Sequence, residues 1–202
     1  MKKWLRPSVF TMLFLSAGLL FFNSWYGGNH SLSEAEISRF LSYVETLDQP
    51  SKKFIQQNDV RRFLTGDDGK PFYVVNFFQF KKPSGVSSFN QFSRRVVPLW
   101  LRYGTHPVFS STEMLDEHSQ WDRLTLVRYR SRRDWVDIVS NPDFIEALPS
   151  RLAATESNSR FIITAILIPN LFLLLLLVVS AALCITYALK KFAFRIKRRE
   201  LA

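Results

Sequence analysis

The sequence contains little of several residue types on which particular functions depend. Its 202 residues include one cysteine, three histidines and seven glycines. A single cysteine excludes a disulfide scaffold and a zinc site built from thiolates. The sequence has no glycine-rich phosphate loop and no nucleophile motif. The apolar fraction of 47% excludes a disordered chain. We therefore predict a folded protein with no metal site and no cofactor.

Acidic residues are also scarce, but the imbalance is concentrated at the two ends. The chain has 27 Lys and Arg against 17 Asp and Glu, a net charge of +10. The two ends account for +8 of it, with Glu200 as their one acidic residue. The basic residues there are Lys2, Lys3, Arg6, Lys190, Lys191, Arg195, Lys197, Arg198 and Arg199. Because the middle of the chain is nearly balanced, we predict no nucleic-acid partner.

Each basic end adjoins a long run without charge. The first run, Val9–Tyr26, has eighteen residues, and the second, Phe161–Leu189, has twenty-nine. About 20 apolar residues cross a bilayer as a helix. Since Pro169 divides the second run, we predict an N-terminal anchor at 1–26 and a transmembrane helix at 169–189, followed by a basic tail at 190–202. One long helix kinked at the proline is the alternative.

The basic flanks predict the topology of these two spans. Lysine and arginine near span ends favour the cytoplasm, which places both termini inside and the intervening residues in the periplasm of a bacterial inner membrane. Membrane lipid is then a partner. Trp25 and Tyr26 suit the membrane interface. A cleaved signal peptide is the alternative, but bulky residues stand where its cleavage site needs small ones.

The residues between the anchors predict an α+β domain. Ser33 and Glu36 have capping-box spacing before a helix of about residues 32–47, and with a weaker helix at 51–64 this gives a helical extension at 27–70. The domain at 71–168 follows. Its expected elements are a strand at 72–80, a helix at 89–103, a hairpin of strands at 107–114 and 121–130, helices starting at Ser131 and Asn141, and a strand at 160–168.

That order is β-α-β-β-α-β, the ferredoxin-like pattern of an antiparallel sheet with helices on one face. We predict Gly104 at the end of the first of these helices and a kink or split at Pro98 inside it. The strand at 72–80 is apolar on both faces, so both faces need cover.

Four segments carry a resemblance to a known family: VVNFFQF, SRRVVPLWLRYG, WDRLTLVRYRSRRDW and NPDFIEALPSR. Together they resemble the dimeric α/β-barrel superfamily, and within it a small bacterial branch of uncharacterised domains. The resemblance covers about residues 71–168. It implies a ferredoxin-like fold and a homodimer in which two protomers pack sheet against sheet, which would cover both faces of the strand at 72–80. Its relatives include cofactor-independent monooxygenases and haem-degrading enzymes. Asn76 matches an asparagine on their first strand. Leu148 stands where the haem-degrading enzymes need a histidine, so we expect no haem chemistry.

These observations leave three functional hypotheses. The first is a double-anchored membrane protein whose periplasmic domain self-associates and acts as a binding or interaction module. The second is an enzyme like the cofactor-independent monooxygenases, acting on an apolar substrate, and the third is an accessory subunit of a membrane complex. Asn76 and His106 are the candidate ligand-pocket residues. A buried amide bonded to backbone is the structural alternative for Asn76, and the catalytic residues are not identified.

Overall fold

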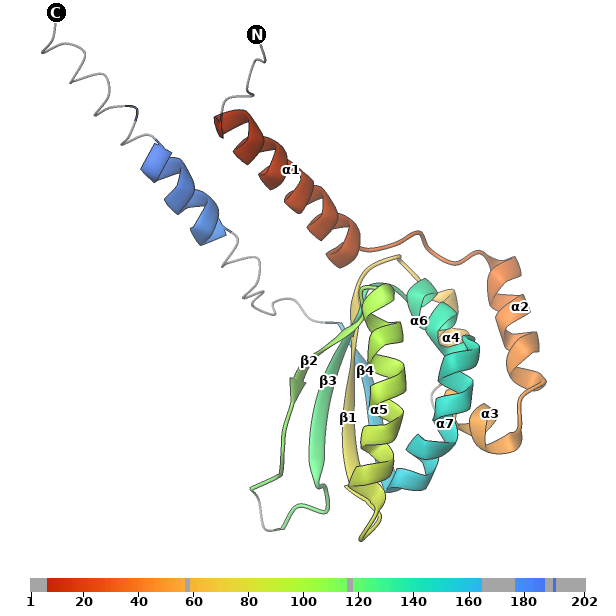
Figure 1. Ribbon diagram of the computed structural model, residues 1–202. Coiled ribbons are helices and arrows are strands. Elements are labelled where there is room, and N and C mark those ends of the chain that lie inside the picture. The colour runs from red at the N-terminus through yellow and green to blue at the C-terminus, as the bar shows by residue number, and fades with distance from the viewer. Residues whose placement is uncertain (1–6, 57–58, 116–117, 165–176, 188–190, 192–202) are drawn as a thin grey trace, which may run out of the picture. The chain divides into compact units, whose positions relative to one another are not determined.

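The computed structural model describes residues 7–56, 59–115, 118–164, 177–187 and 191 (Figure 1). The chain divides into two compact units. Residues 20–165 form one unit, and residues 1–19 together with 166–202 form the other. The four strands of the described chain all belong to the first unit, which is called the domain below.

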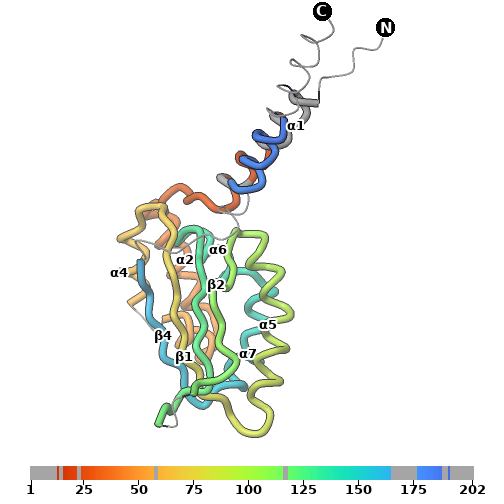
Figure 2. Tube along the Cα trace, turned by 90° about the vertical axis from the view of Figure 1, so that its left-hand side faces the viewer, coloured from red at the N-terminus to blue at the C-terminus, as the bar shows by residue number. Residues whose placement is uncertain are grey.

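The domain is built on one antiparallel sheet with the strand order β2-β3-β1-β4. Figures 1 and 2 show the helices gathered on one face of this sheet. The elements are β1 (Phe72–Phe80), α5 (Gly85–Arg102), β2 (His106–Ser110), β3 (Arg123–Tyr129), α6 (Arg132–Val139), α7 (Pro142–Ala154) and β4 (Thr155–Ile163). This order and these connections are those of the ferredoxin-like fold, so the predicted α+β class is confirmed.

The two faces of β1 have different surroundings. Side chains alternate along a strand, and those on the helix side, including Phe72 and Phe78, are buried. On the other face Val75 and Phe77 stay partly exposed. The described residues therefore cover one face of the sheet and leave an apolar face open, except at the buried Tyr73.

Local capping signals place three helices of the domain. The Ser33 side chain accepts from the Glu36 backbone and Glu36 accepts from the Ser33 backbone, which confirms the capping box at the start of α2 (Glu34–Glu45). Ser131 caps α6, and Asn141 caps α7 ahead of a proline in its first turn. In each case the side-chain oxygen satisfies a backbone N–H that the helix leaves open.

The region before β1 packs into the same core as the sheet. The weak helix expected at 51–64 is two short helices, α3 (Gln49–Ile55) and α4 (Val60–Thr65). Buried residues from α2, α3 and α4 join those of the sheet and the later helices in one apolar cluster. One contact in it is the edge of Trp135 against Phe40, with ring centroids 5.8 Å apart.

The last strand begins earlier than the sequence predicts. β4 starts at Thr155, directly after α7, whereas the prediction began at Arg160 and ran to residue 168. The segment Thr155–Ser159 is polar and has little strand propensity, but it pairs with Gln79, Phe78 and neighbouring residues of β1. Tertiary pairing therefore overrides local propensity here. Residues 165–168 lie outside the described part of the chain.

The predicted split of the helix at Pro98 is wrong. α5 continues through Pro98 from Gly85 to Arg102. Four buried residues on one side of this helix, Phe89, Phe92, Val96 and Leu99, pack into the core. Burial of this stripe holds the helix together across the proline. Tyr103 ends it, and Gly104 follows with a positive φ of 65°, as expected after a helix end.

The first apolar run forms the helix α1 (Pro7–Tyr26). Its last residues belong to the domain: the Trp25 indole donates to the Leu101 carbonyl at 2.9 Å, and the Arg130 guanidinium donates to the Ser24 carbonyl at 3.0 Å. Gly104 lies so close that a Cβ there would be 2.3 Å from the Trp25 carbonyl oxygen. Glycine at position 104 therefore allows the end of α1 to pack closely against the residues that follow α5.

Within the described residues, no helix combines the length and the apolar character needed to cross a membrane. Within the predicted second span, 169–189, residues 177–187 are described and are helical, and the other residues of the span lie outside the described part. Lys191 is exposed. The other basic residues of the two ends lie outside the described part: Lys2, Lys3, Arg6, Lys190, Arg195, Lys197, Arg198 and Arg199.

Candidate functional site

A cavity of about 210 Å³ lies inside the domain, between the sheet and the helices. Its walls come from strands β1, β2, β3 and β4 and from helices α3, α5, α6 and α7. Aromatic rings are the commonest side chains of its lining: Phe54, Phe78, Phe89, Phe92, Trp100, Tyr129, Trp135 and Phe144. An apolar cavity of about 150 Å³ holds a benzene molecule, so this one has room for a compound with a single ring.

The cavity meets solvent between helix α5 and the edge strand β2. Three of its lining residues are exposed: Asn90 on α5, and Pro107 and Ser110 on β2. The residues at its other side, Asn76 and Arg151, are buried. A ligand entering beside the edge strand would therefore move toward a polar inner end.

Arg151 from α7 is the main polar group at that inner end. Its residue is 7% exposed. One guanidinium nitrogen, Nη2, donates to the amide oxygens of Asn76 and Asn158, each at 3.3 Å. Four phenylalanine rings surround the guanidinium carbon, with centroids at 4.9 to 5.8 Å: Phe54, Phe78, Phe89 and Phe92.

Two further arginines line the cavity. Arg160 on β4 donates to the Phe54 carbonyl at 2.7 Å and lies over the ring of Phe54. Arg123 on β3 lies over the rings of Phe80 and Phe89. The Nε atoms of both are buried without a hydrogen-bond partner among the described residues. The cavity therefore holds N–H groups that its own walls do not satisfy.

The cavity has a positive charge that its lining does not balance. No aspartate or glutamate is among the lining residues that the structure describes. Burial raises the pKa of Tyr129 to about 12, so its hydroxyl stays neutral at pH 7. Burial and the positive charge of Arg160 lower the pKa of Arg151 to about 9, which still leaves the guanidinium charged at pH 7.

Asn76, one of the two predicted pocket residues, lines this cavity. It is buried on the helix-facing side of β1, between Thr125 of β3 and Arg160 of β4 in the sheet register. Its side-chain oxygen accepts from Arg151. The amide therefore takes part in the polar inner end of the cavity, where its oxygen accepts from a side chain rather than from the backbone.

His106, the other predicted pocket residue, is not among the lining residues. It starts β2 and stacks on the Trp25 ring, with centroids 5.1 Å apart and planes 13° apart. Burial and the charge of Arg128 lower the pKa of His106 below its ordinary value. Arg128 in turn lies over the Tyr26 ring and donates to the Tyr26 carbonyl. Trp25 and Tyr26, predicted for the membrane interface, thus contact strands β2 and β3 within the domain.

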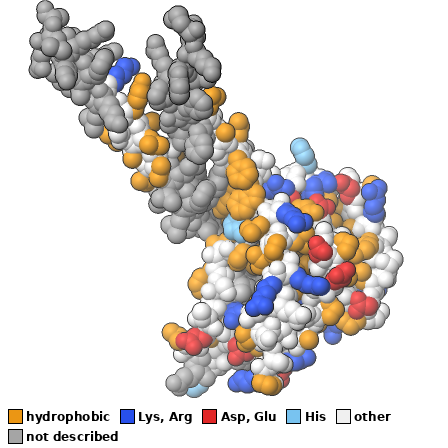
Figure 3. Space-filling model, viewed as in Figure 1, with side chains coloured by type: hydrophobic (Ala, Val, Ile, Leu, Met, Phe, Trp, Pro, Cys, Tyr) orange, Lys and Arg blue, Asp and Glu red, His pale blue; other side chains and the backbone are white. Residues whose placement is uncertain are grey.

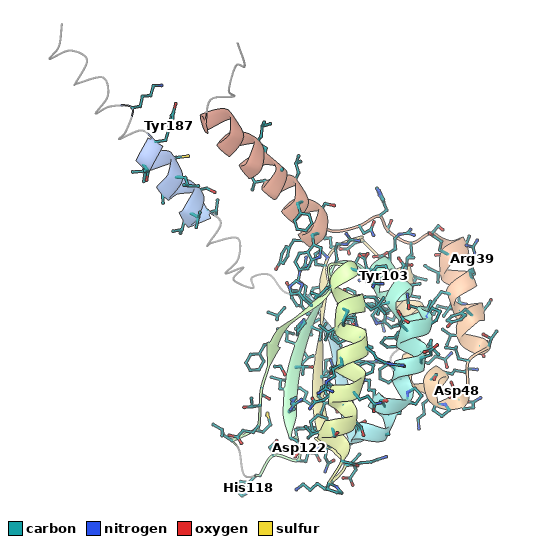
Figure 4. All side chains as sticks on the ribbon, viewed as in Figure 1. Arg39, Asp48, Tyr103, His118, Asp122 and Tyr187 are labelled. Carbon is teal, nitrogen blue, oxygen red and sulfur yellow. The ribbon has the colours of Figure 1, made fainter. Side chains whose placement is uncertain are left out.

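The remaining histidines do not join either of these sites. Figure 4 places His118 at the tip of the β2–β3 connection, at the opposite end of the domain from Tyr103 and hence from His106. His30 is exposed after α1. In the described part of the chain, no cluster of three or more His, Cys, Asp or Glu residues could hold a metal ion.

Sequence reasoning missed the cavity arginines, although one signal for Arg151 was present. Along α7 the apolar stripe places Phe144, Ala147 and Leu148 at helical spacing, and Arg151 falls at the next position of the same stripe. A charge on the buried side of an amphipathic helix needs an explanation. Arg160 gave no such signal. The prediction starts the last strand at Arg160, and a charged residue at the end of a strand needs no explanation.

The fold and the cavity define a ferredoxin-like α+β domain with an aromatic, positively charged interior. Searches find no matching family model and no matching curated protein. Among solved structures, the chain is similar to RPA0582, a protein of unknown function from Rhodopseudomonas palustris. Two structures of it give 22% and 18% identity and TM-scores of 0.48 and 0.46, covering 55% and 70% of this chain and 92% and 99% of that one.

A second similar structure is SnoaB, a cofactor-independent oxygenase from Streptomyces nogalater, at 12% identity and a TM-score of 0.38. The similarity covers 49% of this chain and 96% of SnoaB. A dimeric ferredoxin-like protein of unknown function from Bacteroides fragilis matches at 10% identity and a TM-score of 0.38, over 47% of this chain and 96% of that one. The fold assignment above rests on the strand order of this chain itself.

Proposed function

We propose that this protein is a membrane-anchored, self-associating domain that binds an apolar small molecule. The observation that carries the proposal is the cavity of about 210 Å³, lined by aromatic rings and open beside the edge strand. Concave, mostly apolar sites with a few converging polar groups are the usual form of small-molecule sites. The polar groups here are Asn76 and the arginines at the inner end.

The membrane part of the proposal rests on exposed apolar side chains at both ends of the described chain. On α1 they include Leu20 and Phe21, exposed to 72% and 70%, and on residues 177–187 they include Val178 and Ile185. Figure 3 shows hydrophobic side chains on these segments, whereas charges of both signs are mixed over the domain. Several large apolar side chains exposed along one helix suit a membrane or protein contact. We place the domain in the periplasm, with both termini cytoplasmic.

The self-association part rests on the open face of the sheet. Apolar side chains project there from all four strands: Val75, Phe77, Phe109, Leu124, Leu126, Phe161 and Ile163. Phe77 and Phe161 already contact each other edge to face. A second copy would present the same apolar face, as a two-fold symmetric interface requires. We therefore assign this face to a homodimer.

Native mass spectrometry of the detergent-solubilised full chain tests both parts together. We expect a homodimer that retains an apolar compound. Phe161→Glu places a charge on the open face and should convert the dimer to a monomer, because a buried unpaired carboxylate is costly. Val86→Glu, on the exposed side of α5, is the matched control and should leave the dimer intact. A monomeric wild-type chain would contradict the self-association.

The topology has its own test, made simple by the single cysteine. In a Cys184→Ser chain expressed in a bacterial host, a cysteine at His118 should react with a membrane-impermeant maleimide in intact spheroplasts. A cysteine at Lys197 should react only after lysis. The reason is that the domain and the basic tail lie on opposite sides of the membrane in this proposal. Labelling of both sites in intact spheroplasts would refute the assigned topology.

An enzyme like the cofactor-independent monooxygenases is the second candidate, favoured by the position of Asn76 in the cavity. Oxygen uptake with the compound recovered from the native complex separates an enzyme from a binding domain. The third candidate, an accessory subunit of a membrane complex, requires a second chain in the same native spectrum.

A further inference from the structure

We propose that the ligand of this cavity is an anion: an apolar, ring-sized compound that bears one negatively charged oxygen group, held by Arg151 and Arg160. This inference rests on the proposed function, because it names the class of compound that the same cavity binds. Three features of the cavity support it: its positive charge, its unsatisfied hydrogen-bond donors and its aromatic walls.

The guanidinium groups of Arg151 and Arg160 are buried positive charges, and such charges are costly without a partner of opposite sign. A charged group that leaves water loses its hydration, and proteins recover this loss by pairing it with an opposite charge. Other arginines of the domain follow that rule: Arg130 pairs with Asp134 at 2.5 Å, and Arg133 pairs with Glu36. Arg151 and Arg160 have no such partner among the described residues, and each repels the other. An anion in the cavity would supply the missing charge.

The hydrogen-bond donors lead to the same conclusion. Arg160 Nε, Arg123 Nε and the indole Nε1 of Trp100 are buried without a partner in the described chain, and all three residues line the cavity. The bonds of Arg151 to Asn76 and Asn158 are long, at 3.3 Å each. The converging groups are therefore donors. An oxygen anion accepts several hydrogen bonds at once, and charge-assisted bonds of this kind are the strong ones.

The walls of the cavity determine the size and the apolar character of the uncharged part of the ligand. Phenylalanine rings surround the guanidinium of Arg151, and their faces partly stabilise its charge. An apolar body that carries the charged group would contact these rings, whereas a small, multiply charged ion such as phosphate would leave them without an apolar partner. The cavity of about 210 Å³ exceeds the roughly 150 Å³ that holds benzene. A single ring or a branched chain carrying one carboxylate or phenolate fits both the volume and the charge.

A pair of isosteric probes tests the inference on the full chain in non-ionic detergent. Benzoate and benzamide have the same ring and nearly the same size, but only benzoate is charged. Trp100 and Trp135 line the cavity and report binding by fluorescence. We expect benzoate to bind at least tenfold more tightly than benzamide. Arg160→Gln should remove this difference, whereas Arg95→Gln, on the exposed side of α5, should keep it.

Each outcome of the wild-type titration decides a separate point. Equal affinity for the two probes would overturn the anion inference and leave an apolar binding site in place. Binding of neither probe would contradict the proposed function itself. Inorganic phosphate binding as tightly as benzoate would show that the site recognises charge alone, against the apolar part of the inference. Because these comparisons use the wild-type chain, they stand even where Arg160→Gln does not fold.

Discussion

Asp134→Asn is expected to lower the free energy of unfolding by about 3 kcal/mol, since removing one partner of a buried ion pair costs roughly this much. Asp134 is 1% exposed. It accepts hydrogen bonds from Arg130 at 3.0 and 2.5 Å, from the Ser131 hydroxyl at 2.5 Å and from the Asn29 amide at 3.2 Å. The asparagine would leave the Arg130 guanidinium without its counter-charge and would turn an NH₂ group toward other donors.

Asp137→Asn, three residues further along α6, is the matched control for this change. Asp137 is exposed; burial and the negative charge of Asp134 raise the pKa of its carboxyl, and the charge of Arg133 lowers it. We expect its substitution to change stability by no more than about 0.5 kcal/mol. Thermal unfolding followed by tryptophan fluorescence should show a fall of roughly 10 °C for Asp134→Asn alone. Equal melting temperatures for the two variants would mean that the buried pair adds nothing to stability.

The elements that the sequence predicts well are those with a local physical cause. Ser33 with Glu36, Ser131 with Asp134, and Asn141 with its following proline each satisfy open backbone donors within four residues. Such signals depend only on the near neighbours in the chain. The strand Phe72–Phe80 was equally clear, because its aromatic and β-branched residues suit only a sheet. From these elements the ferredoxin-like order followed.

The elements that the sequence predicts poorly depend on contacts with residues far away in the chain. Nothing local makes Thr155–Ser159 a strand, and only pairing with β1 does so. Pro98 stays inside α5 because the stripe from Phe89 to Leu99 is buried on both sides of it. The candidate site shows the same division. Asn76 could be found from its strand, but the approach of α7 to β4, which brings Arg151 near Arg160, is set by the packing of the whole domain.

The presence of a charged residue, Arg151, on the buried side of α7 is not explained by its effect on stability. A side chain on the apolar stripe of α7 would normally be leucine or methionine, yet here it is a buried cation facing another cation. Residues that weaken a fold in this way are expected where function requires them. If the charge exists to bind a ligand, removing it should improve the fold and damage the binding. A purely structural arginine would show the opposite effect on stability.

Arg151→Met is expected to separate the two properties. Methionine is long, unbranched and apolar, so it can fill the space between the phenylalanine rings. Replacing an unpaired buried charge by an apolar side chain should raise the stability of the ligand-free chain, by about 1 kcal/mol after the loss of the long bonds to Asn76 and Asn158. Benzoate affinity should fall by roughly 100-fold or more, because one of the two charges that hold the anion is gone.

The same substitution at an exposed arginine gives the reference for both measurements. Arg95→Met removes an ion pair with Glu146 whose two side chains are 57% and 68% exposed, and such pairs contribute at most about 1 kcal/mol. It should leave benzoate binding unchanged. Thermal unfolding then gives the stability, and fluorescence titration gives the benzoate affinity, of the wild-type, Arg151→Met and Arg95→Met chains. A large loss of stability in Arg151→Met, with benzoate affinity intact, would make Arg151 a structural cation stabilised by its aromatic rings. A gain in stability together with lost affinity means that the domain keeps a destabilising charge because an anion requires it.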